Sequence, residues 1–145
     1  DYDLEVFGVC QDNSSQVTSG ASAGLKISNV TGMDTDGEAI MAGHKTVSNG
    51  VTGGQWDRVW YIDNTGDLGA DLTFDYAGAG VVSPGDGTEM LLQYKATEGA
   101  TFSTLGSRSA ISSGAVTFSV AAGSLADGYY TLATAPPAGT VVSIR

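Results

Sequence analysis

Alternation of apolar and polar positions is the dominant pattern along the chain. In the segment 71–76 every second residue is apolar, namely Leu72, Phe74 and Tyr76. The segments 89–95 and 116–120 repeat this pattern, with Leu91 as an exception. In the segment 56–62, Trp56, Trp60 and Ile62 lie on one face of a further predicted strand. A period of two predicts β-strands that bury one face and leave the other wet. Since no long stretch has apolar residues at helical spacing, we expect no substantial helix.

Weaker alternation predicts further strands, and turn signals separate them. These strands are expected at 2–9, 25–30, 38–44, 101–105, 129–133 and 140–144. Pairs such as Asn49-Gly50, Gly53-Gly54 and Asp127-Gly128 mark turns between them. About ten short strands with frequent turns predict an all-β fold, an antiparallel β-sandwich of jelly-roll or Ig-like type. We expect one domain over residues 1–145, with a Pro-containing spacer and a last strand at 134–145.

Charge narrows the classes of partner. The chain has 16 acidic and 6 basic residues, for a net charge of −10. Because phosphate contacts supply most of the affinity for nucleic acids, we expect no nucleic-acid partner. No apolar run approaches the length of a membrane span, so we expect no membrane insertion. Low charge with many Gly, Ser and Thr residues is typical of secreted bacterial surface proteins, and we expect an extracellular or cell-surface location. Because the sequence opens with Asp1, we expect a processed or excised segment.

Several motifs occur in an order that resembles a known module. They are Ile40–His44, Trp56–Asp63, Thr65–Gly69, Leu72–Asp75, Leu91–Tyr94, Val116–Phe118 and Leu125–Leu132. As a set they are similar to a β-sandwich repeat module of large bacterial secreted and cell-surface proteins. The resemblance covers roughly residues 24 to 132, and Ala133 stands where that module usually has Gly. It implies an extracellular structural or adhesive role and supplies no catalytic residue.

Candidate catalytic groups are sparse. Gly20–Gly24 matches the G-x-S-x-G pattern of serine hydrolases, but that motif needs a strand before it and a helix after it. Here a strand is predicted after it, which favours a plain loop. His44 is the sole histidine and is expected to be a hydrogen-bonded structural residue. Cys10 is the sole cysteine and is expected to be a small buried hydrophobe, with an intermolecular disulfide as the alternative. We therefore expect no enzymatic activity.

Two acidic turns and a set of aromatic residues are candidate binding sites. Asp34 and Asp36 lie in one turn, and Asp63 and Asp67 in another. Their oxygens could bind Ca²⁺, although these residue types also favour turns for local reasons. A glycan could stack on an exposed tyrosine, for which Tyr61 and one of Tyr129 and Tyr130 are the candidates. Trp56 and Trp60 are expected in the core.

The ends of the chain indicate an assembly role. The first strand alternates from Tyr2, and the last is also apolar. A terminal strand can add to the open sheet edge of a neighbour, and repeated head-to-tail addition makes a filament. We expect a homopolymeric structural subunit of an extracellular filament or surface assembly. In it Tyr2, Leu4 and Val6 fill a groove of the next copy, and Val141, Val142 and Ile144 help to close the receiving sheet. The alternative is a Ca²⁺- or carbohydrate-binding module of a larger adhesin or secreted enzyme.

Overall fold

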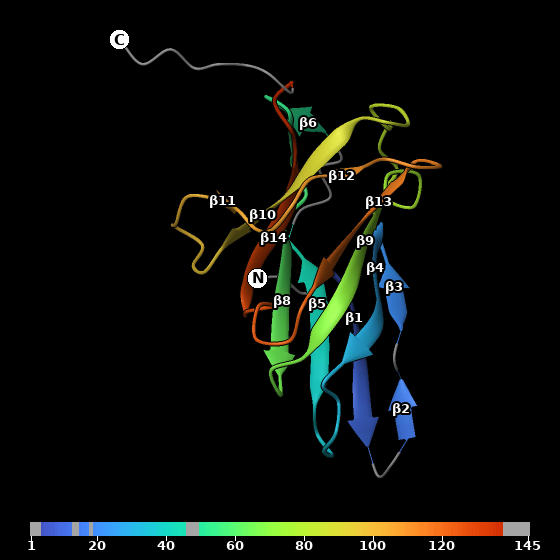
Figure 1. Cartoon of the computed structure of the whole chain (residues 1–145), viewed down its shortest axis with the longest axis vertical. Helices are drawn as coiled ribbons and strands as arrows, with labels where there is room; N and C mark the ends of the chain where they lie inside the picture. Colours follow the sequence, from blue (N-terminus) through green and yellow to red (C-terminus); the bar gives the residue numbers. More distant parts are fainter. Residues whose placement is uncertain (1–3, 13–14, 18, 46–49, 138–145) are drawn as a thin grey trace.

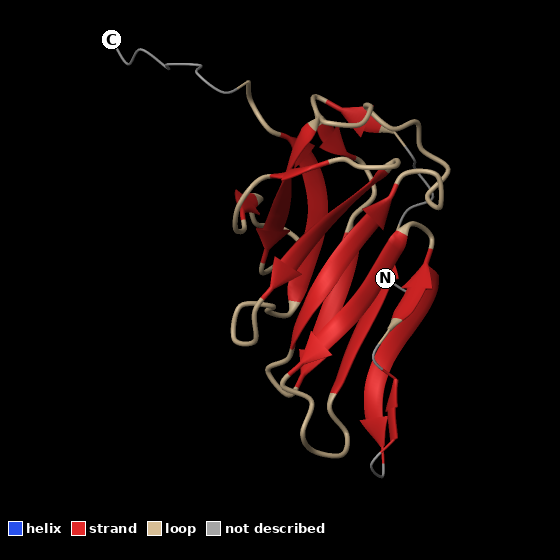
Figure 2. Ribbon diagram, turned by 45° about the vertical axis from the view of Figure 1, so that its right-hand side comes forward, coloured by secondary structure: helices blue, strands red, loops and turns tan. Residues whose placement is uncertain are grey.

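The computed structural model describes residues 4–12, 15–17, 19–45 and 50–137. These residues form two antiparallel sheets packed face to face, and none of them lies in a helix (Figure 1, Figure 2). The predicted all-β sandwich is confirmed. Within the same residues there is also no helix long and apolar enough to cross a membrane.

The larger sheet, sheet A, runs between two edges made of very short strands. In order, its strands are β11 (Ser103–Thr104), β10 (Glu89–Lys95), β14 (Gly128–Thr134), β8 (Trp60–Thr65), β5 (Ala39–His44), β1 (Leu4–Asp12) and β2 (Ser15–Val17). Three short strands join this path: β12 (Ser109–Ala110) on β10, β7 (Gln55–Trp56) on β14 and β6 (Val51–Thr52) on β7.

The smaller sheet, sheet B, has four strands. Their order is β13 (Ala115–Val120), β9 (Gly69–Asp75), β4 (Leu25–Thr31) and β3 (Gly20–Ser22). The six strands of two or three residues were mostly not expected from the sequence, because segments so short carry no measurable alternation. The strand expected at 101–105 is limited to β11, and the one expected at 140–144 lies outside the described residues.

The core forms where the predicted apolar faces of the two sheets meet. From sheet B, Leu72 and Phe74 are 0% exposed, and from sheet A, Trp60 and Ile62 are 0% exposed. Trp56 stacks on Tyr76 with ring centroids 5.1 Å apart. The prediction that Trp56 and Trp60 are core residues is therefore confirmed. The strands are held together because each buries one face against the other sheet.

The G-x-S-x-G segment is a hairpin and not a nucleophile elbow. Ser22 ends β3, and β4 begins at Leu25 and pairs back on it. The two residues between them, Ala23 and Gly24, have φ values of 46° and 90°. Two consecutive residues with positive φ form the tight turn that matches the twist of an antiparallel hairpin. The structural context of a serine nucleophile is absent here.

Candidate functional site

The two sides of the sandwich differ in how the sheets meet. On one side the chain passes directly from β2 in sheet A to β3 in sheet B, and β3 packs against β1. A Cβ added to Gly20 would lie 3.1 Å from the carbonyl oxygen of Gly8, which shows how closely these strands approach. On the other side, β13 is the last strand of sheet B and lies opposite the segment between β11 and β12. The sandwich is therefore closed on the β3 side and open beside β13.

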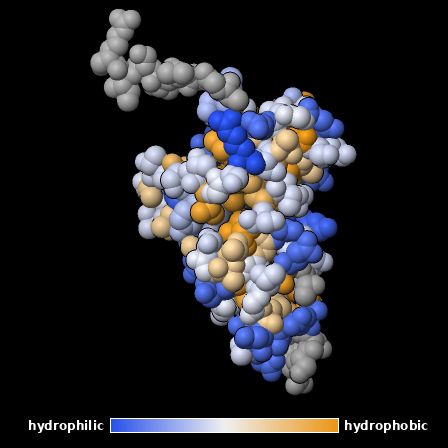
Figure 3. Space-filling model, viewed as in Figure 1, coloured by the Kyte–Doolittle hydropathy of each residue, from blue (hydrophilic) through white to orange (hydrophobic). Residues whose placement is uncertain are grey.

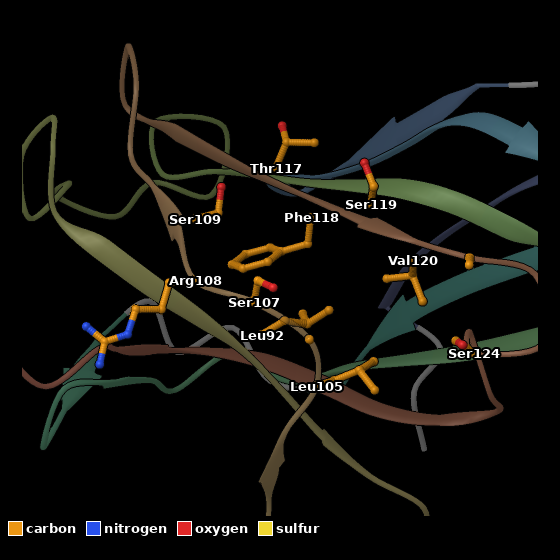
Figure 4. Close-up of a pocket in the computed structure, with 12 residues that line it drawn as sticks. Leu92, Leu105, Ser107, Arg108, Ser109, Thr117, Phe118, Ser119, Val120 and Ser124 are labelled. Carbon is orange, nitrogen blue, oxygen red and sulfur yellow. The ribbon is translucent and has the colours of Figure 1, made fainter.

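A groove of about 410 Å³ lies between the sheets on this open side. Its apolar floor consists of Leu92, Leu105, Phe118 and Val120, which point toward one another in Figure 4. Phe118 and Val120 are 6% and 8% exposed, whereas Val116 at the start of β13 is 1% exposed. Small polar residues and Arg108 surround the floor. On the same face as Figure 1, Figure 3 shows apolar atoms along the middle of the molecule, in the region where β13 and β14 lie.

Beyond Ala115, whose N–H and C=O pair with Ser112 of the same chain, strand β13 has none of the sequence features that usually protect a sheet edge. Its sequence, Ala-Val-Thr-Phe-Ser-Val, contains no charged residue and no proline. Within the described residues it is the longest strand at a sheet edge, since β2, β3 and β11 have two or three residues. Native proteins commonly shorten, charge or cover such edges, because unpaired N–H and C=O groups can pair with another chain. This edge is therefore a candidate site for β-strand addition.

Hydrogen bonds on the outer face of sheet B fix the orientation of β13. Thr117 Oγ1 lies 2.8 Å from Thr73 Oγ1, and Ser119 Oγ donates to Asp71 Oδ1 at 2.5 Å. Asn29 Nδ2 donates to the other oxygen of Asp71 at 2.6 Å. The hydroxyl of Ser119 and the amide of Asn29 hold the pKa of Asp71 below its usual value. With these polar groups outward, the alternation of the strand directs Phe118 and Val120 into the groove.

Arg108 lies at the rim of the groove and connects three segments. Its Nη1 donates to Glu89 Oε2 at 2.9 Å and to the carbonyl oxygen of Pro136 at 3.0 Å. Ala135 N also donates to the carbonyl oxygen of Glu89, at 2.9 Å. The chain that follows β14 is therefore held beside the groove, through hydrogen bonds with Arg108 and with Glu89, the first residue of β10.

The residues predicted for the polymer interface have different outcomes. Tyr2, Val141, Val142 and Ile144 lie outside the described residues. Leu4 begins β1, which pairs with β5 on one side and with β2 on the other. Val6 is 50% exposed and lies where the register between β1 and β5 shifts. In this chain the first strand is thus part of its own sheet, and its transfer to a neighbour stays a prediction.

The two acidic turns lie side by side, because β5 follows the first and β8 precedes the second, with Ala39 paired to Thr65. The turn at Asp34 and Asp36 is organised by Glu38, whose Oε2 accepts from Asp34 N at 2.6 Å and Thr35 N at 2.8 Å.

Asn64, near the end of β8, organises the other turn, which contains Asp67. Asp63 lies within β8 and pairs with Met41, so the expectation that it lies in a turn is wrong. The side-chain amide of Asn64 donates to the carbonyl oxygens of Leu68 and Leu125, at 2.8 and 2.7 Å. Across the described residues, no three His, Cys, Asp or Glu side chains are grouped to hold a metal ion, so this geometry gives the predicted Ca²⁺ site no support.

Replacing Glu38 with Gln is expected to flatten the acid part of the stability profile. The backbone N–H groups of Thr35 and Asp34 lower the pKa of Glu38 from its ordinary value of 4.5. A depressed pKa means that the carboxylate stabilises the fold above pH 4.5, and that this contribution is lost as the pH falls through the lower folded-state pKa. Chemical denaturation from about pH 6 to about pH 3 should show a smaller loss of stability for Glu38→Gln than for the parent chain. Equal pH dependence of the two proteins would contradict this role.

The aromatic candidates divide as the strand alternation requires. Tyr130 is 0% exposed, and its hydroxyl donates to the carbonyl oxygen of Ala126. Tyr61 and Tyr129 are half-buried on the outer face of sheet A, with an edge-to-face contact at 5.1 Å. Lys95 Nζ lies 5.5 Å from the ring centroid of Tyr129. Glycan stacking on this pair stays a prediction.

The sole histidine and the sole cysteine have opposite environments. His44 is 2% exposed and packs on Trp60 with ring centroids 4.9 Å apart, which agrees with a structural residue. Cys10 is exposed, so the expectation that it is buried is wrong. The reason is the alternation of β1, in which Val9 faces the core at 0% exposure and the next residue points outward.

The comparisons with known proteins find no match: no family model, no curated protein and no solved structure matches this chain. The resemblance to the bacterial surface module therefore stays an expectation from the sequence. The groove beside β13 was not predicted. The alternation of 116–120 could be seen in the sequence, but no local signal shows that this strand lies at an edge.

Proposed function

We propose that this chain is a structural subunit of an extracellular assembly, in which copies join by adding a strand of one copy to the sheet of the next. The observation that carries the proposal is the uncharged edge of β13 beside a groove that has an apolar floor and a polar rim. In strand addition, backbone hydrogen bonds along an edge supply affinity, and pockets for alternate side chains fix the register. The edge of β13 and the groove beside it could supply these two components of strand addition.

A contact of this kind would also propagate from copy to copy. A strand contributed from one part of a copy and received at β13 of another is a heterologous contact, which generates open filaments or rings. The charge of −10 disfavours non-specific association of the same molecules. Assembly would therefore depend on the directional contact at β13.

Filling the groove should abolish assembly. Ser107 is an exposed residue of the groove wall, so Ser107→Trp would place a large ring over the floor with little cost to the fold. Electron microscopy and light scattering should show multimers for the full chain and 14.7 kDa monomers for Ser107→Trp. Thr97→Trp is the matched control, since Thr97 is also an exposed loop residue but does not line the groove. A monomeric parent chain, or a Ser107→Trp variant that assembles normally, would overturn the proposal.

A further inference from the structure

We infer that the strand received by β13 is the segment 140–145 of a second copy, with Val142 and Ile144 in the groove. This inference rests on the proposed function and identifies its donor. Residues 140–145 have the sequence Thr-Val-Val-Ser-Ile-Arg. If extended, this segment places Thr140, Val142 and Ile144 on one face, and Val141, Ser143 and Arg145 on the other. Its apolar face suits a groove whose floor is Leu92, Leu105, Phe118 and Val120.

The N-terminal strand is a poor donor because it is already integrated. Phe7 packs on Trp60 with ring centroids 6.2 Å apart, and Val9 is 0% exposed. Gln11 also exchanges backbone hydrogen bonds with the neighbouring turn, from its N–H to the Glu38 carbonyl and from Gly37 N to its own carbonyl. Transfer of β1 to another copy would expose this part of the core and leave β5 unpaired on one side. Use of the segment after β14 leaves both sheets intact.

The exit of the chain from β14 favours donation to a different copy. Strand β13 ends at Val120, near the end of the sandwich where β14 begins, because Leu125 in the connecting loop bonds to Asn64 of the adjacent turn. The two strands therefore run in opposite directions, and β14 ends near the start of β13. A segment that turned back along β13 of its own copy would run parallel to it.

A neighbour's segment can instead enter antiparallel, which is the more stable arrangement per residue. Pro136 and Pro137 are both exposed and restrict the backbone to extended conformations. Arg108 fixes the carbonyl of Pro136 at the rim, so this stiff pair starts from a defined point. Both features favour exchange between copies over closure within one.

Paired aspartate variants test the donor face in the full chain. The double variant Val142→Asp/Ile144→Asp should weaken the affinity between copies by about tenfold or more, because each substitution removes an apolar side chain from the groove. Val141→Asp with Ser143→Asp is the matched control, with equal added charge on the opposite face, and should assemble much more nearly like the parent. Loss of assembly in Ser107→Trp together with normal assembly of Val142→Asp/Ile144→Asp would retain the proposed function and overturn this inference. Normal assembly of Ser107→Trp would overturn the proposed function itself.

Chains with a single cysteine test which segment occupies the groove: the C-terminal segment of another copy, the N-terminal segment, or the C-terminal segment of the same copy. In a Cys10→Ser background, one chain carries Ser107→Cys and a second carries Val142→Cys, and the two are mixed and oxidised. We expect a disulfide-linked heterodimer in excess over either homodimer, because the proposed contact brings residue 142 of one copy close to residue 107 of the next. A heterodimer that forms instead between Ser107→Cys and Tyr2→Cys chains would assign the groove to the N-terminal segment. A chain with both Ser107→Cys and Val142→Cys that closes only internally would assign it to the same copy. Either result would overturn the inference.

Discussion

Replacing Trp60 with alanine is expected to lower the free energy of unfolding by about 3–5 kcal/mol, the usual cost of truncating a buried large aromatic residue. Trp60 is 0% exposed and lies between Phe7 of β1 and His44 of β5, with ring centroids 6.2 and 4.9 Å away. Its removal would leave a cavity under three neighbouring strands of sheet A. Denaturant unfolding should measure this loss, and the melting temperature should fall by about 10 °C or more.

Trp60→Phe is the control that separates packing from hydrogen bonding. The indole Nε1 of Trp60 has no hydrogen-bond partner in the described part of the chain. Phenylalanine would keep an aromatic ring against the same neighbours and leave no partner group unsatisfied. It should therefore cost clearly less than alanine. If both variants lost the same stability, the ring contacts with Phe7 and His44 would not be the source of the effect.

Replacing Gly24 with alanine is expected to cost at least about 2 kcal/mol, since two penalties add. The φ of Gly24 is +90°, a conformation that L side chains rarely adopt. In addition, a Cβ at this position would lie 2.5 Å from Ala79 Cβ and 2.8 Å from the carbonyl oxygen of Asp75. The carbonyl of Gly24 accepts a hydrogen bond from Asp75 N, so the turn cannot move away without losing it. Chemical denaturation with far-UV circular dichroism would give the loss.

Gly37→Ala isolates the steric part of this penalty. Gly37 has almost the same φ, +88°, but a Cβ there would meet nothing within 4 Å. Its cost should be limited to the conformational term of about 1–2 kcal/mol. The difference between the two variants would measure the close packing of the β3–β4 turn on the loop after β9. A Gly37→Ala variant as unstable as Gly24→Ala would contradict this account.

The sequence predicted the longer strands well because each has a face that must be buried. Residues 71–76 and 116–120 alternate clearly, and both form strands with the expected side chains in the core. Short strands such as β11 could not be predicted, since they exist through pairing with β10 and not through a local pattern. Cys10 is exposed because its neighbour Val9 faces the core. Which of the two residues faces the core was decided only by the packing of β1.

The candidate site could not be predicted from the sequence, because it also depends on contacts between distant segments. Edge position is a property of strand order, and in sheet B the pairs β13–β9 and β9–β4 join segments that are far apart in the chain. The acidic segments show the limit of local signals. Asp34, Asp36 and Gly66 correctly mark turns, but a metal site also needs oxygens that converge, and Glu38 Oε2 and Asn64 Oδ1 instead accept hydrogen bonds from nearby backbone N–H groups.

By itself, the sequence determined the fold class, the positions of the main strands and turns, and the core role of Trp56 and Trp60. These are consequences of alternation and turn chemistry, which act between neighbouring residues. Only the tertiary structure decided that β13 is the longest edge strand among the described residues, that Leu92, Leu105, Phe118 and Val120 share one groove, and that Arg108 holds Pro136 at the rim of this groove. The physical reason is that pairing order and the gap between two sheets arise from contacts between distant segments, which no local pattern specifies.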